Sequence, residues 1–457
     1  MEKTQQYIKT NKENFLSDLF EVLRIPSISS IASHRPDMDR TAEWLKARLE
    51  KAGVDKAEIF PTAGPSIVYA EKIIDPKLPT VLVYGHYDVM PVDPVELWNT
   101  DPFEPVVKDG FIFARGADDD KGQSFMHIAA FEAMVESGEL PCNAKFMLEG
   151  EEEIGSGNLT KWCAEFKDML SADIILVSDT SMLGLETPSI TCGLRGLAYV
   201  EVEVTGPNRD LHSGLYGGAV ANPINILCDM ISESIDADGR ITVEGFYDNI
   251  YELSAEERAE IAKSPFSEEA FKASIDIAEV QGEKGYSTME RKGIRPTFDV
   301  CGIWGGYIGE GAKTVIPSIA TAKVSTRLVA GQDFKRITNL LTEHFERIAP
   351  KSVKVKVTAS HGGVPYISPT DTPAYMAASE AIETTFGKKP LPFYSGGSIP
   401  IISTFESTLG IKSILMGFGL DSDAIHSPNE NYSLECFYKG METIPYFYKN
   451  FTAKLNK

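Results

Sequence analysis

Three short apolar segments, each followed within four residues by a histidine or a carboxylate, constrain the fold of this chain most strongly. The segments are 80–84 (TVLVY), 144–148 (AKFML) and 173–177 (DIILV), and they precede His86, Glu152 and Asp179. A helical segment, 122–136, lies between the first two. Strands that alternate with helices predict a mostly parallel sheet flanked by helices, an α/β fold. Because such sheets bind ligands beyond the carboxyl ends of their strands, these three side chains are candidates for one site.

The periodicity of the apolar residues changes after about residue 194. Segments 197–205 (LAYVEVEVT), 319–329 (IATAKVSTRLV) and 353–359 (VKVKVTA) alternate with a period of two, and the helical segment 333–348 lies among them. This pattern predicts a smaller antiparallel sheet with helices on one side. A chain of 457 residues exceeds the size of a single core, so we expect this part to be a separate domain.

Composition excludes several classes of function. The formal net charge of −22 argues against a nucleic-acid partner, because binding phosphates needs clustered Lys and Arg. No apolar run approaches the roughly 18 residues of a membrane span, and the amino terminus lacks the apolar core of a signal peptide. The six cysteines show no CxxC spacing, so they predict neither a disulfide framework nor a thiolate zinc site. We therefore expect a cytoplasmic protein with reduced, buried cysteines and no membrane partner.

The segment GHYDV places His86 and Asp88 two residues apart, so that both side chains point the same way on an extended chain. A histidine that binds a metal needs its second ring nitrogen oriented by a neighbour, and a carboxylate is the usual one. Alone, this pair is equally compatible with a structural histidine.

Two acidic clusters favour a metal site more strongly. RGADDDKG, residues 115–122, holds three adjacent aspartates before a helix, and the alternative is a solvated loop whose last Asp caps that helix. EGEEEIGS, residues 149–156, holds four acids directly after an apolar strand. Adjacent glutamates there can divide the work, one accepting a proton from a metal-bound water and the next binding metal. His426, in AIHSPNEN, is a distant further candidate.

These motifs occur in one order along most of the chain, together with VSDT, GLRG, DLHSGLYGG, GAKTVIPS, HGGVPY and GGSIP. The set resembles the M20 metallopeptidases, and within them the cytosolic nonspecific dipeptidase and carnosinase branch. The resemblance implies a zinc-peptidase-like catalytic domain in two parts, 1–193 and 366–457. It implies an inserted α+β lid and dimerisation domain at 194–365. The polar, mostly helical segment 254–292 has no role that the sequence assigns.

The resemblance also implies two divalent metal ions bridged by Asp119. His86 and Asp179 would complete one site, and Glu153 and His426 the other. Imidazole and carboxylate ligands without thiolate suit Zn²⁺ first, with Mn²⁺ or Co²⁺ as alternatives. Relatives of this kind carry a non-proline cis peptide after Asp119, and we expect one here.

The implied reaction is hydrolysis of the peptide bond of dipeptides or very short peptides by a hydroxide that bridges the metals. Glu152 would be the general base, Asp88 would orient His86, and His212 would stabilise the oxyanion from the partner subunit of a homodimer. The candidate substrate-binding residues are Arg327, Thr314, His361, Gly397 and Ser398. Of these, Arg327 and Thr314 would anchor a free carboxylate of the substrate.

One departure from the family pattern leaves the substrate open. Ser395 stands where relatives of this branch usually carry Glu, so recognition of a substrate amino group is in question. The alternative is an M20 deacylase of N-acyl amino acids, of the acetylornithine or succinyl-diaminopimelate type. A non-catalytic metal-binding scaffold is a third reading, against which the retained Glu152 argues, because a scaffold needs no proton acceptor.

Overall fold

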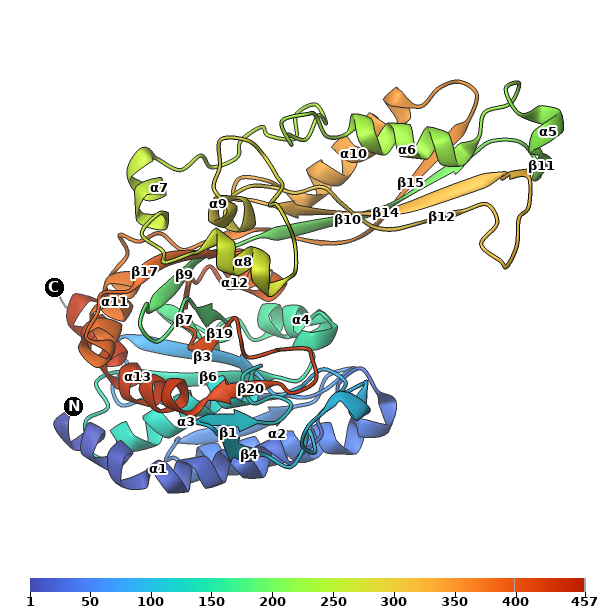
Figure 1. Cartoon of the computed structure of the whole chain (residues 1–457). Helices are drawn as coiled ribbons and strands as arrows, with labels where there is room; N and C mark the ends of the chain where they lie inside the picture. The colour runs from blue at the N-terminus through green and yellow to red at the C-terminus, as the bar shows by residue number, and fades with distance from the viewer. Residues whose placement is uncertain (398, 456–457) are drawn as a thin grey trace. The chain divides into compact units, whose positions relative to one another are not determined.

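The computed structural model describes residues 1–397 and 399–455, and the chain forms two compact units (Figure 1). Unit 1 comprises Met1–Cys192, Ser368–Phe393 and Thr404–Lys457, and unit 2 comprises Gly193–Ile367 and Tyr394–Ser403. Unit 1 is therefore built from both ends of the chain, and unit 2 is mostly one continuous insertion.

Unit 1 is an α/β structure that contains most of a nine-stranded sheet, of which β16 falls within the residues of unit 2. The four central strands, in the order β6-β3-β7-β18, are parallel, whereas β1, β2, β9 and β16 add antiparallel edges. The sheet consists of β1 (Lys56–Phe60), β2 (Ile67–Lys72), β3 (Thr80–His86), β6 (Asn143–Glu149), β7 (Ile174–Val177), β9 (Ser189–Leu194), β16 (Tyr366–Ile367), β17 (Leu391–Ser395) and β18 (Ser413–Leu415). Two small sheets accompany it. One consists of β4 (Val106–Lys108), β5 (Phe111–Phe113) and β20 (Asn431–Ser433), and the other consists of β8 (Ser181–Met182) and β19 (Gly419–Leu420).

Helices pack against this sheet and against one another. Helix α3 packs against β3, and both α1 and α13 pack against α3. The helices are α1 (Glu2–Leu23), α2 (Arg35–Lys51), α3 (Lys121–Glu136), α4 (Gly157–Glu165), α11 (Pro373–Phe386), α12 (Pro400–Leu409) and α13 (Leu434–Leu455), with 3₁₀ turns η1 (Ala32–His34), η2 (Val95–Leu97) and η3 (Glu152–Ile154). The predicted α/β fold with a mostly parallel sheet is thus confirmed.

The first helix begins earlier than the sequence predicts. The apolar spacing of Phe15, Leu19 and Leu23 predicts a helix that starts near Asn11, but α1 begins at Glu2. The added turns are held by contacts distant in sequence, because Thr4 Oγ1 donates to Glu139 at 2.7 Å and the Tyr7 hydroxyl donates to Glu132 at 3.1 Å. Such tertiary contacts have no signature in the local apolar pattern.

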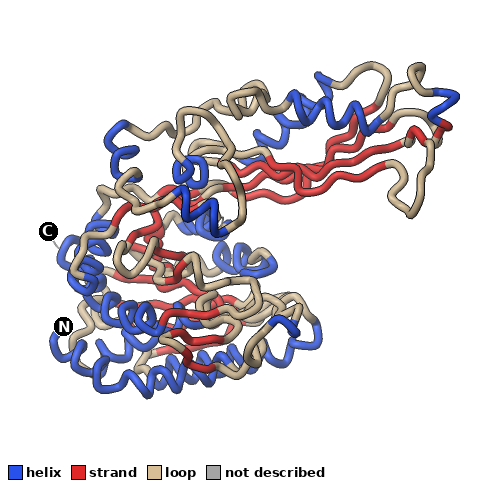
Figure 2. Tube along the Cα trace, viewed as in Figure 1, coloured by secondary structure: helices blue, strands red, loops and turns tan. Residues whose placement is uncertain are grey.

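Unit 2 contains a four-stranded antiparallel sheet in the order β12-β14-β10-β15, whose strands Figure 2 draws in red. One face is a core in which Val200, Val202 and Val324 pack with Leu341 and Phe345. The strands are β10 (Gly196–Thr205), β12 (Asp299–Gly305), β14 (Ile319–Leu328) and β15 (Lys354–Gly363), and β11 (Leu211–His212) pairs with β13 (Val315–Ile316). The helices are α5 (Ser213–Tyr216), α6 (Pro223–Glu233), α7 (Ala255–Ile261), α8 (Glu268–Ser274), α9 (Thr288–Gly293) and α10 (Phe334–Ile348).

The structure also bears on two expectations from composition, that the cysteines are reduced and buried and that the chain has no membrane span. All six cysteines are free thiols, but the prediction that all are buried is wrong, because Cys228 and Cys301 are exposed. Cys301 lies on β12, an edge strand of the unit 2 sheet whose residues are mostly exposed. Among the described residues, none of the helices combines the length and the hydropathy that crossing a bilayer requires.

Candidate metal centre

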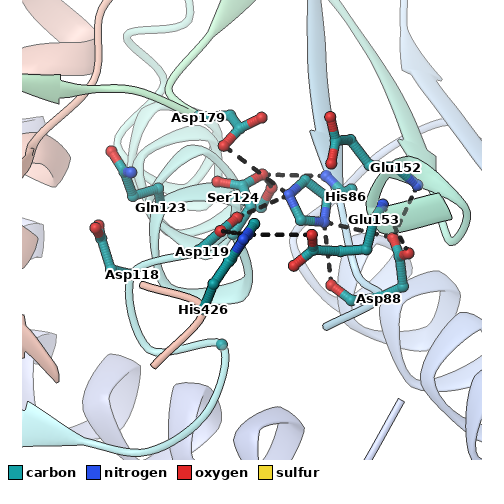
Figure 3. Close-up of polar contacts among 12 residues, drawn as sticks. His86, Asp88, Asp118, Asp119, Gln123, Ser124, Glu152, Glu153, Asp179 and His426 are labelled. Atoms are coloured by element: carbon teal, nitrogen blue, oxygen red, sulfur yellow. Dashed lines mark hydrogen bonds and ion pairs between the residues drawn. The ribbon is translucent and has the colours of Figure 1, made fainter. Parts of the chain in front are cut away.

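Five side chains of unit 1 converge in two groups that share one carboxylate (Figure 3). His86, Asp119 and Asp179 form one group, and Asp119, Glu153 and His426 form the other, with the potential ligand atoms of each group within 4.8 Å of one another. The residues come from the ends of β3 and β7, the loop before α3, the turn η3 and the loop before β20. The structure therefore brings together all five side chains that the sequence singled out as ligands.

His86 is the last residue of β3 and is fully enclosed. Its Nε2 lies 3.1 Å from Asp119 Oδ1 and 3.9 Å from Asp179 Oδ1. Its Nδ1 lies 3.0 Å from the Asp88 carbonyl oxygen and 3.4 Å from the Asp88 carboxylate. Asp88 thus fixes the ring through both its backbone and its side chain, which leaves Nε2 directed at the two carboxylates.

The Asp119 carboxylate lies between two imidazoles. Its Oδ2 is 2.9 Å from His426 Nε2, which is also 3.2 Å from Glu153 Oε2. His426 sits in a loop with positive φ, at +59°, a conformation that is uncommon for residues other than glycine. The peptide bond between Asp119 and Asp120 is cis, as the resemblance led us to expect.

Buried groups hold the Asp119 loop in place. The Glu430 carboxylate accepts hydrogen bonds from the backbone N–H groups of Gly116, Asp118 and Asp119 at 3.1–3.2 Å. It also forms a 2.6 Å ion pair with the buried Arg115. Sequence reasoning missed Glu430, although its position four residues after His426 in the NEN stretch was an available signal.

Asp120, the last aspartate of the cluster, was considered from the sequence only as a cap of the following helix. Its carboxylate accepts from the His86 backbone N–H at 3.0 Å and from Ser124 Oγ at 2.5 Å. It stands at the N-cap position of α3 but makes no side-chain cap to the helix backbone. The last aspartate of the cluster therefore ties the loop to β3.

The adjacent glutamates of η3 have different surroundings. The backbone N–H groups of Glu152 and Glu153 donate to the two oxygens of the Asp88 carboxylate, at 3.2 and 3.1 Å. Glu153 Oε2 reaches His426, whereas no donor in the described part of the chain is hydrogen-bonded to the Glu152 carboxylate. Glu152 therefore carries an uncommitted carboxylate beside the two ligand groups (Figure 3).

The electrostatics of the cluster are those of a site built for cations. The pKa of Glu152 is raised to about 7, because burial and the neighbouring Asp119 and Glu153 carboxylates together outweigh the opposing effect of His86. Burial also raises the pKa of Asp179 well above its usual range. Hydrogen bonds to Asp119 and Glu153 raise the pKa of His426 to about 10. So many enclosed carboxylates repel one another unless protons or metal ions neutralise them.

Two of the expected substrate-binding residues lie near one end of the unit 2 sheet. Arg327 is paired with Leu197 at the start of β10, and Gly363 at the end of β15 is paired with the same residue. His361, two residues before Gly363, stacks on Tyr199 with ring centroids 5.1 Å apart. Arg327 and His361 thus belong to neighbouring positions of the sheet.

His212 and Thr314 lie near the other end. β11 pairs His212 with Val315, and the Ser213 N–H donates to the Thr314 carbonyl at 3.0 Å. β10 ends at Thr205, a few residues before His212 in the chain. At roughly 3.3 Å per residue, Thr205 is about 26 Å along the strand from Leu197. Within one unit 2, His212 and Arg327 are therefore separated by the length of the sheet.

The GGSIP segment is described only in part. Gly397 donates its N–H to Ser395 Oγ at 3.1 Å and accepts from the Arg195 N–H at 3.0 Å. Ser398, the other expected substrate contact of this segment, lies outside the described residues.

Known proteins resemble the chain over nearly all of its length. The chain is 34% identical to the Cys-Gly metallodipeptidase dug1 of Schizosaccharomyces pombe, over 97% of this chain and 96% of that protein. It is 31% identical to the human Beta-Ala-His dipeptidase, over 98% and 92% of the two chains. The solved structure of the M20 family metallo-carboxypeptidase Sso-CP2 from Sulfolobus solfataricus superposes with a TM-score of 0.85 at 34% identity, covering 96% of this chain and 99% of that one. Residues 82–450 match the model of peptidase family M20/M25/M40, to which this chain therefore belongs.

Proposed function

We propose that this protein is a dinuclear metallopeptidase that hydrolyses the peptide bond of dipeptides or very short peptides. The observation that carries the proposal is the pair of ligand groups sharing Asp119, with the uncommitted Glu152 carboxylate beside them. The names of relatives covering nearly the whole chain, a Cys-Gly metallodipeptidase and a Beta-Ala-His dipeptidase, support dipeptides over N-acyl amino acids.

The donor set fits two divalent ions. Asp119 would contribute one oxygen to each ion, His86 and Asp179 would complete one site, and Glu153 and His426 the other. Nitrogen and oxygen ligands without thiolate suit Zn²⁺ first, with Mn²⁺ or Co²⁺ as alternatives. Such ions, when bound, supply a positive field that acidifies water and polarises the scissile carbonyl.

The residues of the chain itself supply proton transfer and orientation. Glu152 takes a proton from the attacking water and delivers it to the leaving amine, since its side chain is half-buried and its carboxylate accepts no hydrogen bond within the described chain. Asp88 holds both the His86 ring and the Glu152 backbone, so the proton acceptor and a ligand share one anchor.

A cationic anchor would select short substrates with a free carboxylate. Arg327 would bind that carboxylate with its planar guanidinium, assisted by His361 and the 397–398 segment, whereas Thr314, which lies at the His212 end of the sheet, would come with His212 from the partner subunit. An anchor at a fixed position limits the number of residues beyond the cleaved bond. The Ser395 departure leaves the substrate amino group without the usual acidic partner.

Two copies of the chain would complete one site. His212 and Arg327 of one chain are separated by the length of the sheet. We therefore propose that the His212 that stabilises the oxyanion comes from the partner subunit. β12, an edge strand, offers a surface for such pairing, since Ile303 and Trp304 are about half exposed on it. The exposed thiols of Cys228 and Cys301 fit a reducing compartment, and we propose the cytoplasm.

A substrate panel tests the proposal. The protein, loaded separately with Zn²⁺ and Mn²⁺, is assayed against Cys-Gly, β-Ala-His, Gly-Gly-Gly, N-acetylornithine, an N-acetyl amino acid and succinyl-diaminopimelate. We expect turnover of the dipeptides, weaker turnover of the tripeptide and little of the acylated compounds. Preference for the acylated compounds would instead establish the deacylase alternative.

A further inference from the structure

The GLRG segment, residues 193–196, joins β9 to β10 in unit 2, and none of the roles considered above uses its arginine. The Arg195 side chain is half-buried and contacts backbone oxygens of two other segments of unit 2. Its Nε donates to the Gly396 carbonyl at 3.1 Å, and its Nη1 lies 3.5 Å from the carbonyls of Arg291 and Arg295. Arg195 thus links the segment 394–397 to the residues at the end of α9.

These segments are packed without spare room. A methyl group added at Gly396 would lie 2.9 Å from the Lys292 carbonyl oxygen and 3.0 Å from Arg195 Nη2. One added at Gly193 would lie 2.7 Å from the Tyr394 ring. Segment 394–397 is therefore held between the GLRG segment on one side and the end of α9 on the other.

The contact lies beside the proposed carboxylate anchor. Leu197, two residues after Arg195, is the β10 partner of Arg327. Burial and the nearby Arg327 lower the pKa of Arg195 to about 10, so the group remains charged at neutral pH. Hydrogen bonds from a charged guanidinium to carbonyl oxygens are stronger than neutral ones.

We infer that Arg195 is a positioning residue for substrate binding, which fixes segment 394–397 at the Arg327 end of the sheet. The inference gives the polar segment 254–292 and its continuation a role, because α9 is the second support of the same loop. The expected kinetic effect of Arg195 rests on the proposed function, whereas the contact between Arg195 and the loop does not depend on it.

The kinetic test compares Arg195→Met, Arg195→Lys and Arg336→Met in the metal-loaded enzyme. Arg336 is the matched control, a unit 2 arginine in an exposed ion pair with Asp248. We expect Arg195→Met to raise KM for a dipeptide about tenfold or more with a small change in kcat, and Arg336→Met to change neither. Lysine keeps the charge but cannot reach both segments, so Arg195→Lys should recover only part of the affinity. A lysine variant equal to wild type would reject positioning in favour of a charge effect.

A second measurement is independent of turnover. Hydrogen–deuterium exchange should be faster in peptides spanning 393–397 in Arg195→Met than in wild type, with α10 unchanged as an internal reference. Unchanged exchange in 393–397 together with unchanged KM would overturn the inference. If wild type fails to cleave dipeptides, the proposed function fails, and the exchange result still decides whether Arg195 holds the loop.

Discussion

Asp88 and Glu152, 64 residues apart in the chain, are joined by a hydrogen bond of 3.2 Å from the Glu152 backbone N–H to the Asp88 carboxylate. The second oxygen of that carboxylate accepts from the next N–H, of Glu153. The same side chain lies 3.4 Å from the His86 ring. One buried carboxylate therefore sets the relative positions of a proposed base and two proposed ligands.

Replacing Asp88 with Asn should lower kcat about ten- to a hundredfold, the usual cost of losing a group that orients a ligand. The amide keeps one acceptor oxygen but turns an N–H donor toward the donors of η3. The measurement is steady-state kinetics together with metal content. Asp101→Asn, which alters an exposed aspartate whose carboxylate accepts the Phe103 N–H, is the control. Equal activity of the two variants would contradict the assigned role.

The two adjacent glutamates should separate binding from catalysis. We expect Glu152→Gln to keep two metal ions per chain and to lose about 10²- to 10⁴-fold in kcat, because only proton transfer is removed. Glu153→Gln should instead lose one ion, because its oxygen lies in the ligand group with Asp119 and His426. Elemental analysis after dialysis, paired with kinetics, distinguishes the two. Loss of metal in Glu152→Gln would identify it as a ligand.

Glu430→Gln should destabilise the protein by about 3–5 kcal/mol, because Arg115 would be left as a buried charge without its partner. Urea unfolding of the metal-free protein measures this change. The double variant Arg115→Met/Glu430→Gln should be less destabilised than the sum of its single variants. Additive effects would show that the two side chains are energetically independent.

The metal-free protein should lose stability as the pH rises from about 5 to 9. Burial raises the pKa of Glu149 to about 8 and those of Asp120 and Asp423 to about 7, against ordinary values near 4. In this window the folded state binds more protons than the unfolded state, so stability is present at low pH and lost as these groups ionise. Melting temperatures in EDTA should therefore fall with pH. With Zn²⁺ the trend should weaken or reverse, because the ions replace the protons; parallel curves would exclude this linkage.

Mixed dimers test the donation of His212. Homodimers of Glu152→Gln and of His212→Ala should both be nearly inactive. Equal mixing should restore about one quarter of wild-type activity, since half of the dimers are mixed and one of their two sites is intact. The mixture is refolded together before assay, and separately refolded proteins combined afterwards serve as the control. No recovery in co-refolded protein would place the histidine in its own subunit's site.

The local sequence predicts the central elements well, because each is a continuous apolar or strongly periodic run. β3, α3, β6 and β7 begin or end within a residue or two of the expected bounds. The supports of the site were less accessible. Three aspartates stand side by side in the sequence, and nothing local distinguishes them. Asp120 ties the loop to β3 because it accepts the His86 N–H, a contact that only the tertiary structure provides. Glu430 likewise acts through backbone groups more than 300 residues away. The capping boxes at Ser254 and Ser287, by contrast, were readable signals within the polar segment.

The pairing of β5 with β20 affects the order in which the site can form during biosynthesis. Residues 111–113 pair with 431–433, and Glu430 and His426 reach the Asp119 loop from the same late segment. An emerging polypeptide can form β3, α3 and β6 early, yet the shared carboxylate acquires its second imidazole only after residue 426 has been synthesised. A product truncated before residue 426 would retain every strand of the nine-stranded sheet, yet it would lose α13 and be confined to a single, unsupported ion site.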